Sequence, residues 1–371
     1  MKQIAVTSVS LDTIDFIPTV IIGFYRKSEK TLFSAEYQIL KKRFPQADII
    51  GCSSAGNIAN ELPYIESRHQ FPCVYLCLKM DKEAFTVEVF HKDDKITPTL
   101  DKEKKYQVIL FSAFTSFELE DMLSPLPSVV GTQRIFGAVA GVDAPAMEEE
   151  AEVFYNGVFY DRHVLLWMID ESRYRIDGMS MHLFRPAGLP LKITSAKGNK
   201  IYELNNQPAM EVLEALAGEL DESAIGTFAY PLFLQKEAEG HWESAPLASM
   251  IGINRKDKSI LLYRSVCNNK YVKLGIMVSQ QDQLKRLRRL YSFAPPKSAA
   301  LLFNCIGIEK NLSMMEYLYL EDVKRHLDIT FVGGHTFGEI GPPATSKKHS
   351  GTVLHNQTMT IALIAEREVS S

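Results

Sequence analysis

The sequence lacks the features of membrane, secreted and nucleic-acid-binding proteins. No apolar run approaches the roughly 20 residues that a membrane-spanning helix needs, and the N-terminal stretch, with Asp12 and Asp15, has no continuous apolar core of a signal peptide. The 41 basic residues are offset by 45 acidic ones, and the formal net charge of −4 provides no broad cationic face for nucleic acid. We therefore expect a soluble cytoplasmic protein that neither inserts into membranes nor binds nucleic acid.

Cysteine is scarce, and the usual signatures of enzymes are missing. The five cysteines are odd in number and lie mostly in apolar runs, which is typical of reduced core thiols. There is no C-x-x-C pair, Walker A loop, G-x-G-x-x-G, H-E-x-x-H or G-x-S-x-G motif. Cys52 precedes two serines, but no histidine is placed by sequence to activate it as a nucleophile. The sequence thus predicts a protein that is not an enzyme and holds no structural metal.

What the sequence does contain is one order of elements used three times: an apolar strand, a helix, a strand that ends in a small-residue turn, and a further strand. We expect opening strands at Thr19–Tyr25, Gln107–Phe114 and Ala299–Cys305, helices at Lys30–Phe44, Phe117–Leu126 and Met315–Leu327, and turns at Gly51–Ile58, Arg134–Asp143 and Asp328–Ile340. The last strands of the second and third copies are predicted as hairpins, Val153–Ile169 through Asn156-Gly157 and Thr352–Ala365 through His355-Asn356-Gln357.

A different stretch, from about Ser172 to Pro296, separates the second and third copies. It contains strands around Gly198-Asn199, a helix at Pro208–Leu216 and a helix around Ser279–Leu290. The predicted fold is α/β, with mixed sheets built from repeated β-α-β-β units in two lobes. We divide the chain into domains at 1–171 and 172–371.

The order of these motifs resembles the FIST family, in which an N-terminal and a C-terminal FIST domain lie in tandem. The resemblance covers nearly the whole chain and rests on Gly51–Gly56, Phe136–Gly141, Phe154–Gly157, Ala196–Asn205, Leu301–Cys305, Gly333–Ile340 and Leu354–Thr358. The first turn departs from the family at Asn57-Ile58, where many relatives have an acidic residue.

The resemblance implies a sensory module for small ligands, proposed to include amino acids. Such modules feed histidine kinases, cyclic-dinucleotide enzymes or chemotaxis proteins. No kinase, cyclase or DNA-binding domain follows Ala365 in this sequence, and we therefore expect any output to be delivered in trans. One branch of the family consists of free-standing proteins, and this chain resembles that branch. Its members bind haem, sense nitric oxide and regulate a histidine kinase.

Glycine turns at the carboxyl ends of strands expose backbone N–H groups where α/β proteins commonly bind ligands. The first and third turns supply the candidate ligand-binding residues, which are Cys52, Ser53, Ser54, Asn57, Gly334, His335, Thr336 and Glu339. Hydroxyl and N–H donors suit a carboxylate, and Glu339 suits an ammonium group, so that an amino acid fits both. Alternatively the glycines serve only tight turns and close packing, and Glu339 caps a neighbouring backbone or pairs with Arg134 or Lys347.

Three functional readings stay open on the sequence. The first is an amino-acid sensor, and the second is a haem sensor of nitric oxide with His335 or His355 as the iron ligand. No C-x-x-C-H motif occurs, which excludes covalently attached haem. The third reading is an interaction scaffold that binds no small ligand.

Overall fold

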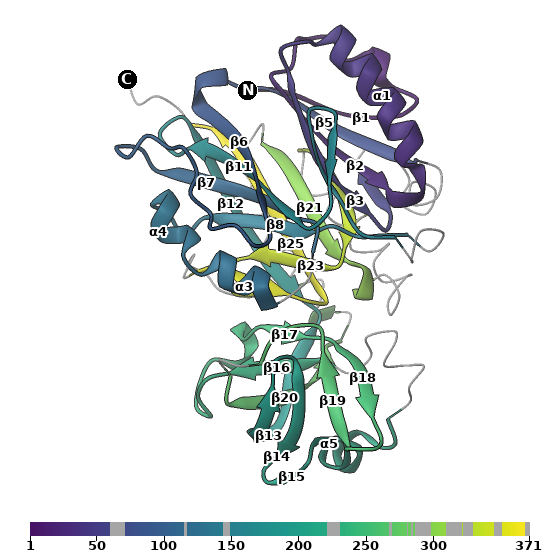
Figure 1. Cartoon of the computed structure of the whole chain (residues 1–371), viewed down its shortest axis with the longest axis vertical. Helices are drawn as coiled ribbons and strands as arrows, with labels where there is room; N and C mark the ends of the chain where they lie inside the picture. Colours follow the sequence, from purple (N-terminus) through teal and green to yellow (C-terminus); the bar gives the residue numbers. More distant parts are fainter. Residues whose placement is uncertain are drawn as a thin grey trace.

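The chain folds into two bodies in the computed structural model, which describes residues 1–59, 71–114, 117–143, 149–220, 231–266, 269–279, 281–282, 285, 298–308, 321, 329–344 and 351–367. Figure 1 shows a large body, which carries both termini, above a small body formed by residues 184–277. No helix among the described residues is long and apolar enough to cross a bilayer.

Three mixed sheets make up the large body. The first has the order β1 (Lys2–Thr7), β5 (Cys73–Lys79), β2 (Val20–Arg26), β3 (Asp48–Ser54), β9 (Val153–Tyr155) and β10 (Val158–Tyr160). The second has β6 (Phe85–His91), β11 (His163–Asp170), β7 (Tyr106–Ser112), β8 (Ile135–Val139), β23 (Gly338–Gly341) and β24 (Val353–His355). The third has β12 (Tyr174–His182), β25 (Thr358–Glu366), β21 (Ala299–Cys305), β22 (Thr330–Thr336) and β4 (Asn57–Ala59).

Each sheet follows the plan of one repeat. A parallel pair forms its centre, namely β2 with β3, β7 with β8, and β21 with β22. The helix α1 (Lys30–Arg43) connects the first pair, and α3 (Phe117–Leu123) and α4 (Leu126–Val130) connect the second. The predicted α/β fold with mixed sheets is therefore confirmed, although strands outnumber helices in the described chain. The predicted helix Met315–Leu327 lies largely outside the described residues.

After each turn the chain leaves its own sheet and joins another. Strand β4 of the first copy pairs with β22, β9 of the second copy pairs with β3, and β23 of the third copy pairs with β8. The three copies thus exchange strands in a closed cycle, and each sheet is completed by a different copy.

This exchange corrects the two predicted hairpins. The turn at Asn156-Gly157, with φ of 46° and 98°, joins β9 and β10 as predicted, but residues 163–170 form β11 in a different sheet. In the third copy, β24 and β25 lie in different sheets, and the chain crosses between them at 356–357. Alternating apolar residues identify a strand, but they do not identify the sheet that it joins.

The inner faces of the three sheets enclose one core. At its centre lie Phe24, Phe111 and Phe303, one from the opening strand of each copy. Their ring centroids are 5.8, 6.0 and 6.2 Å apart and their rings meet edge to face. Such aromatic pairs add roughly 0.5–1.5 kcal/mol to the effect of burial alone. The repeat is therefore preserved where the copies pack together.

The small body is an antiparallel sheet that curls around a helix. Its strands are β17 (Leu247–Ala248), β16 (Leu232–Gln235), β20 (Tyr271–Met277), β13 (Phe184–Lys197), β14 (Lys200–Leu204), β19 (Ser259–Leu262) and β18 (Met250–Asn254), with β15 (Gln207–Pro208) paired to β14. The end strands β17 and β18 are separated in sequence by Ser249 alone, and the sheet must therefore curl. The helix is α5 (Ala209–Ala217), which confirms the predicted Pro208–Leu216 helix.

The intervening stretch begins later than predicted. Residues 174–182 form β12, which pairs along its whole length with β25 and so belongs to the third sheet. The predicted domain boundary at 171/172 falls between β11 and β12. Most of the predicted helix Ser279–Leu290 lies outside the described residues.

The parallel pairs contain glycine where the strands approach each other most closely. A Cβ atom at Gly51, Gly137 or Gly333 would lie 1.9, 1.9 or 1.8 Å from a carbonyl oxygen of the neighbouring strand.

The Gly137→Ala substitution is expected to force β7 and β8 apart and to lower the free energy of unfolding by about 3 kcal/mol or more. Denaturant unfolding measures this loss. The control is Gly252→Ala, whose added Cβ would lie 3.9 Å from Leu261 Cδ1, at ordinary contact distance; an equal effect of both substitutions would contradict the explanation.

Candidate functional site

The three glycine turns meet at one end of the large body. The Ala55 N–H donates to His335 O at 2.9 Å, the Gly141 N–H to Ser53 O at 3.0 Å, and the Phe337 N–H to Val139 O at 3.0 Å. These three hydrogen bonds form a closed ring, which we call the turn junction. A Cβ at Gly141 would lie 2.6 Å from His335 O, and the junction therefore requires glycine there.

The turn junction brings the predicted residues of the first and third turns together, and it buries them. The side chains at 0% exposure are Cys52, Ser53, Ser54, Asn57, His335, Thr336 and Glu339. Gly334 is also buried, and a Cβ there would lie 2.9 Å from Cβ of Ser54. Burial raises the pKa of Cys52 far above its usual range, which keeps the thiol protonated. A ligand that touches these side chains must therefore enter the interior.

Corresponding positions in the first and third turns make the same hydrogen bond. Ser54 Oγ donates to Asn57 Oδ1 at 2.7 Å, and Thr336 Oγ1 donates to Glu339 Oε1 at 2.8 Å. Asn57 Nδ2 also donates to the carbonyls of Phe71 and Pro72, at 3.0 and 2.8 Å. Both the oxygen and the nitrogen of the Asn57 side-chain amide are thus hydrogen-bonded.

The second copy has Asp143 at the corresponding position, six residues after the glycine of its parallel pair. Its carboxylate accepts from Ser28 N at 2.9 Å and Ser28 Oγ at 2.5 Å, and it pairs with Arg26 at 3.2 Å. Burial acts to raise the pKa of Asp143, but the contacts with Ser28 and Arg26 outweigh it and lower the pKa. The buried charge of the second copy is therefore compensated by Arg26 and Ser28 of the first copy.

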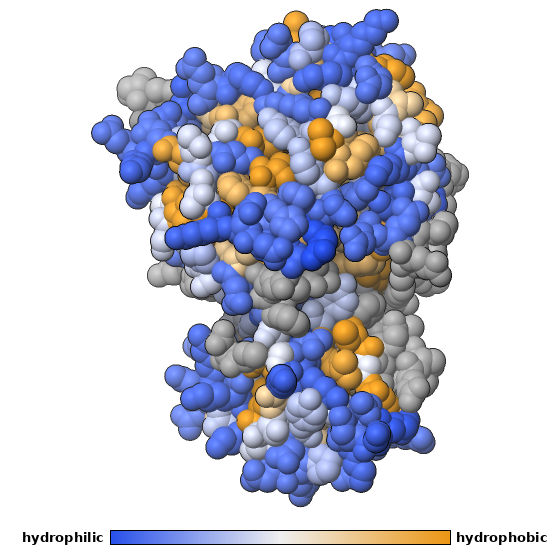
Figure 2. Space-filling view, viewed as in Figure 1, coloured by the Kyte–Doolittle hydropathy of each residue, from blue (hydrophilic) through white to orange (hydrophobic). Residues whose placement is uncertain are grey.

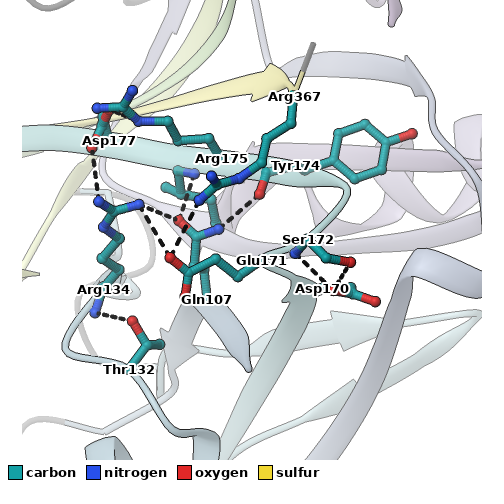
Figure 3. Close-up of polar contacts among 11 residues, drawn as sticks. Gln107, Thr132, Arg134, Asp170, Glu171, Ser172, Tyr174, Arg175, Asp177 and Arg367 are labelled. Carbon is teal, nitrogen blue, oxygen red and sulfur yellow. Dashed lines mark hydrogen bonds and ion pairs between the residues drawn. The ribbon is translucent and has the colours of Figure 1, made fainter. Parts of the chain in front are cut away.

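Glu339 has no such compensation among the described residues. No described cation pairs with it, and burial raises its pKa well above the usual range despite hydrogen bonds from Thr336 and the Thr358 backbone. The sequence alternative of a pair with Arg134 is wrong. Arg134 lies with Glu171 and Asp177, at 3.6 and 4.0 Å, in the network that Figure 3 shows. The other proposed partner, Lys347, lies outside the described residues.

The two candidate haem ligands are enclosed. His335 and His355 are both at 0% exposure, and His355 Nε2 contacts Pro342 O at 2.9 Å. Burial, together with the nearby Arg264 cation, lowers the pKa of His355 to about 3, which keeps its imidazole neutral. Neither histidine is among the residues that line the cleft of about 670 Å³ around Glu120 and Arg264.

An open cleft lies between the two bodies, where Figure 2 shows the molecule narrowing to a waist. It has a volume of about 670 Å³. The large body contributes the α3–α4 segment and residues 351–354, and the small body contributes loops near Gly198, Lys236 and Arg264. Its charged lining residues carry both signs, and they are Glu120, Asp121, Lys236 and Arg264.

Arg264 connects the bodies across this cleft. It comes from the small body and is 6% exposed, and it donates to Leu354 O and pairs with Glu120, both in the large body. Sequence reasoning missed this residue. An arginine in the apolar run Ile260–Val266 was the available signal, because arginine is rarely buried without a partner.

The crossing from β24 to β25 also contacts the small body. The Asn356 N–H donates to Leu247 O at 3.3 Å, and Gln357 Nε2 donates to Ser249 Oγ at 3.3 Å. The adjacent His355 pairs in register with Glu339 across β24 and β23. Two short strands thus connect the cleft to the turn junction.

Two family models match the chain in tandem. The model described as FIST N domain matches residues 19–207, and the one described as FIST C domain matches residues 209–342. No curated protein matches the chain.

The Glu339→Gln substitution tests the protonation of the buried carboxyl. Because the pKa of Glu339 is raised in the folded state, the unfolded chain releases this proton at lower pH, and stability is lost as pH rises from the unfolded pKa towards the folded one. We expect the variant to gain about 1.4 kcal/mol over the wild type per pH unit across that window, starting near pH 4.3. Denaturant unfolding from pH 4 to pH 7 measures the difference, with the exposed Glu203→Gln as control. A difference that does not vary with pH would contradict the assignment.

Proposed function

Since the chain belongs to the FIST family, whose domains are small-ligand sensors in signal transduction, we propose that it binds an amino acid or a similarly amphoteric small molecule. We further propose that this ligand sets the arrangement of the two bodies and regulates a signalling protein in trans. The observation that supports the proposal most directly is the cleft between the bodies, because a ligand there touches both of them. A ligand that touches both bodies can bind one arrangement of them more tightly than another, and only such a difference in affinity shifts a conformational equilibrium.

The lining of the cleft favours an amphoteric ligand. Two carboxylates and two cations face it, together with hydroxyl and amide groups and the apolar side chains of Leu123, Val353 and Leu354. A few polar groups on an apolar wall are typical of small-molecule sites. A carboxylate has Arg264 and Lys236 available, and an ammonium group has Glu120 and Asp121.

The turn junction has a different role in this proposal. Of the residues predicted to contact the ligand, Glu339 lies on β23, which pairs with β24, and Val353 and Leu354 of β24 line the cleft. Direct ligand contact by Ser53 and Glu339 remains a prediction. If it holds, Ser53→Ala and Glu339→Ala lower ligand affinity in a protein that still folds.

The proposed partner is a histidine kinase or a cyclic-dinucleotide enzyme in the cytoplasm, and we propose no catalytic activity for the chain itself. Among the described residues the polar contacts between the bodies come from Arg264, from Asn356 and Gln357, and from His182 with Glu243 O, and a relative movement of the bodies is the simplest change that a partner could recognise.

The haem sensor and the scaffold predict different observations. A nitric-oxide sensor shows a stoichiometric Soret band after haemin is added, and the band is lost on His335→Ala or His355→Ala. We expect no such band, because both imidazoles are enclosed. A Soret band that depends on either histidine would replace the amino-acid proposal, and a scaffold would respond to neither haemin nor amino acids.

Filling the cleft tests where the ligand binds. Ser124 lines the cleft at an exposed position, and Ser124→Trp is expected to abolish the rise in Tm that an amino acid causes in the wild type. At 100 times Kd that ligand stabilises the fold by about 2.7 kcal/mol. The matched control is Val129→Trp, a 41% exposed position in the adjacent helix that does not line the cleft. Equal ligand responses of the two variants would place the site elsewhere.

A further inference from the structure

We propose that the Arg264–Glu120 ion pair is a displaceable latch between the two bodies, and that a ligand carboxylate takes the place of Glu120 on Arg264. This inference rests on the proposed ligand cleft and adds the chemical group that the cleft recognises. It also identifies the contact that changes on binding.

Not every N–H group of the Arg264 guanidinium has a hydrogen-bond acceptor among the described residues. Nη1 donates to Leu354 O, and Nη2 pairs with Glu120 Oε1. Nε is buried and has no hydrogen-bond acceptor among the described residues. A buried N–H without an acceptor is unfavourable because it has lost its hydrogen bond to water, and the present contacts therefore leave a donor that a ligand can satisfy.

The geometry of arginine points to a carboxylate as that ligand group. The Nε and Nη2 atoms form one edge of the guanidinium, on which a planar carboxylate can accept two parallel hydrogen bonds. In the described contacts, Glu120 uses one atom of that edge. A free carboxylate that binds both atoms gains a hydrogen bond that Glu120 does not make.

The position of Glu120 allows a ligand to displace it from Arg264. Its side chain is 24% exposed, and it lies next to Asp121, which also lines the cleft. Burial raises the pKa of Glu120 in spite of the attraction to Arg264, and the charge of Asp121 raises it further. Once displaced, Glu120 can turn towards water or towards a cationic group of the ligand.

Displacement changes the link between the bodies. Arg264 belongs to the small body and Glu120 to α3 of the large body, 144 residues apart in the chain. When a free carboxylate replaces Glu120, the ion pair no longer joins the bodies, while the bond from Arg264 to Leu354 O keeps the arginine on β24. Binding of the carboxylate is thereby coupled to the contact of α3 with the small body.

Acetate is the probe, because it carries the carboxylate and nothing else that the cleft could recognise. The full chain is labelled with ¹⁵N-arginine, and the Nε–H signal of Arg264 is assigned by its absence from Arg264→Lys. We expect a saturable shift of that signal with acetate at constant ionic strength and none with acetamide. Glu120→Gln removes the competing carboxylate and should lower the half-saturating acetate concentration about tenfold.

The control is Glu203→Gln, which removes an exposed carboxylate of the small body that does not line the cleft and should leave the half-saturating concentration within about twofold. The inference is overturned if neither the wild type nor Glu120→Gln shows a saturable shift, or if acetamide shifts the signal as acetate does. Tighter binding of sulfate or phosphate than of acetate would overturn the carboxylate assignment. Should an amino acid raise Tm equally in the wild type and in Arg264→Gln, the latch is wrong while the sensor proposal stands.

Discussion

The ring of backbone hydrogen bonds at the turn junction is the constraint on which the large body depends. Each of the three sheets would otherwise end at β3, β8 or β22 with an open edge, whose unpaired N–H and C=O groups invite aggregation. The strand that covers that edge comes from another copy of the repeat in every case. No copy can therefore complete its sheet alone, and the large body folds as one unit.

The same arrangement explains where the copies diverge. At the threefold centre they keep phenylalanine, because three rings must fill one space. Six residues beyond each conserved glycine the residues differ: Asn57 is satisfied by backbone carbonyls, Asp143 by Arg26 and Ser28, and Glu339 is buried without a described cation. The small body is inserted into the third copy, which also carries that uncompensated group. The third copy thus differs from the other two both in containing an inserted body and in burying a carboxyl group without a described cation.

Much of the fold could be predicted because its signals are local. The repeated order of elements, the turn at Asn156-Gly157 and the helix α5 all follow from periodicity and turn residues. The exchange of strands could not be predicted, since a strand pattern fixes which face is buried but not which sheet is joined. For the site, the sequence correctly placed two glycine turns together, but it did not reveal that their side chains are enclosed. The Arg264–Glu120 contact joins residues too distant in sequence for any local pattern to connect.

The distance between the two bodies should change when a ligand binds in the cleft. Spin labels at the exposed positions Val129 in the large body and Leu189 in the small body report that distance, with Cys267 replaced by serine so that it is not labelled. If the cleft binds an amino acid and controls the arrangement of the bodies, a mixture of the standard amino acids at millimolar concentration shifts the distance distribution. The Ser124→Trp protein should not respond. An unchanged distribution in the wild-type background would contradict the account.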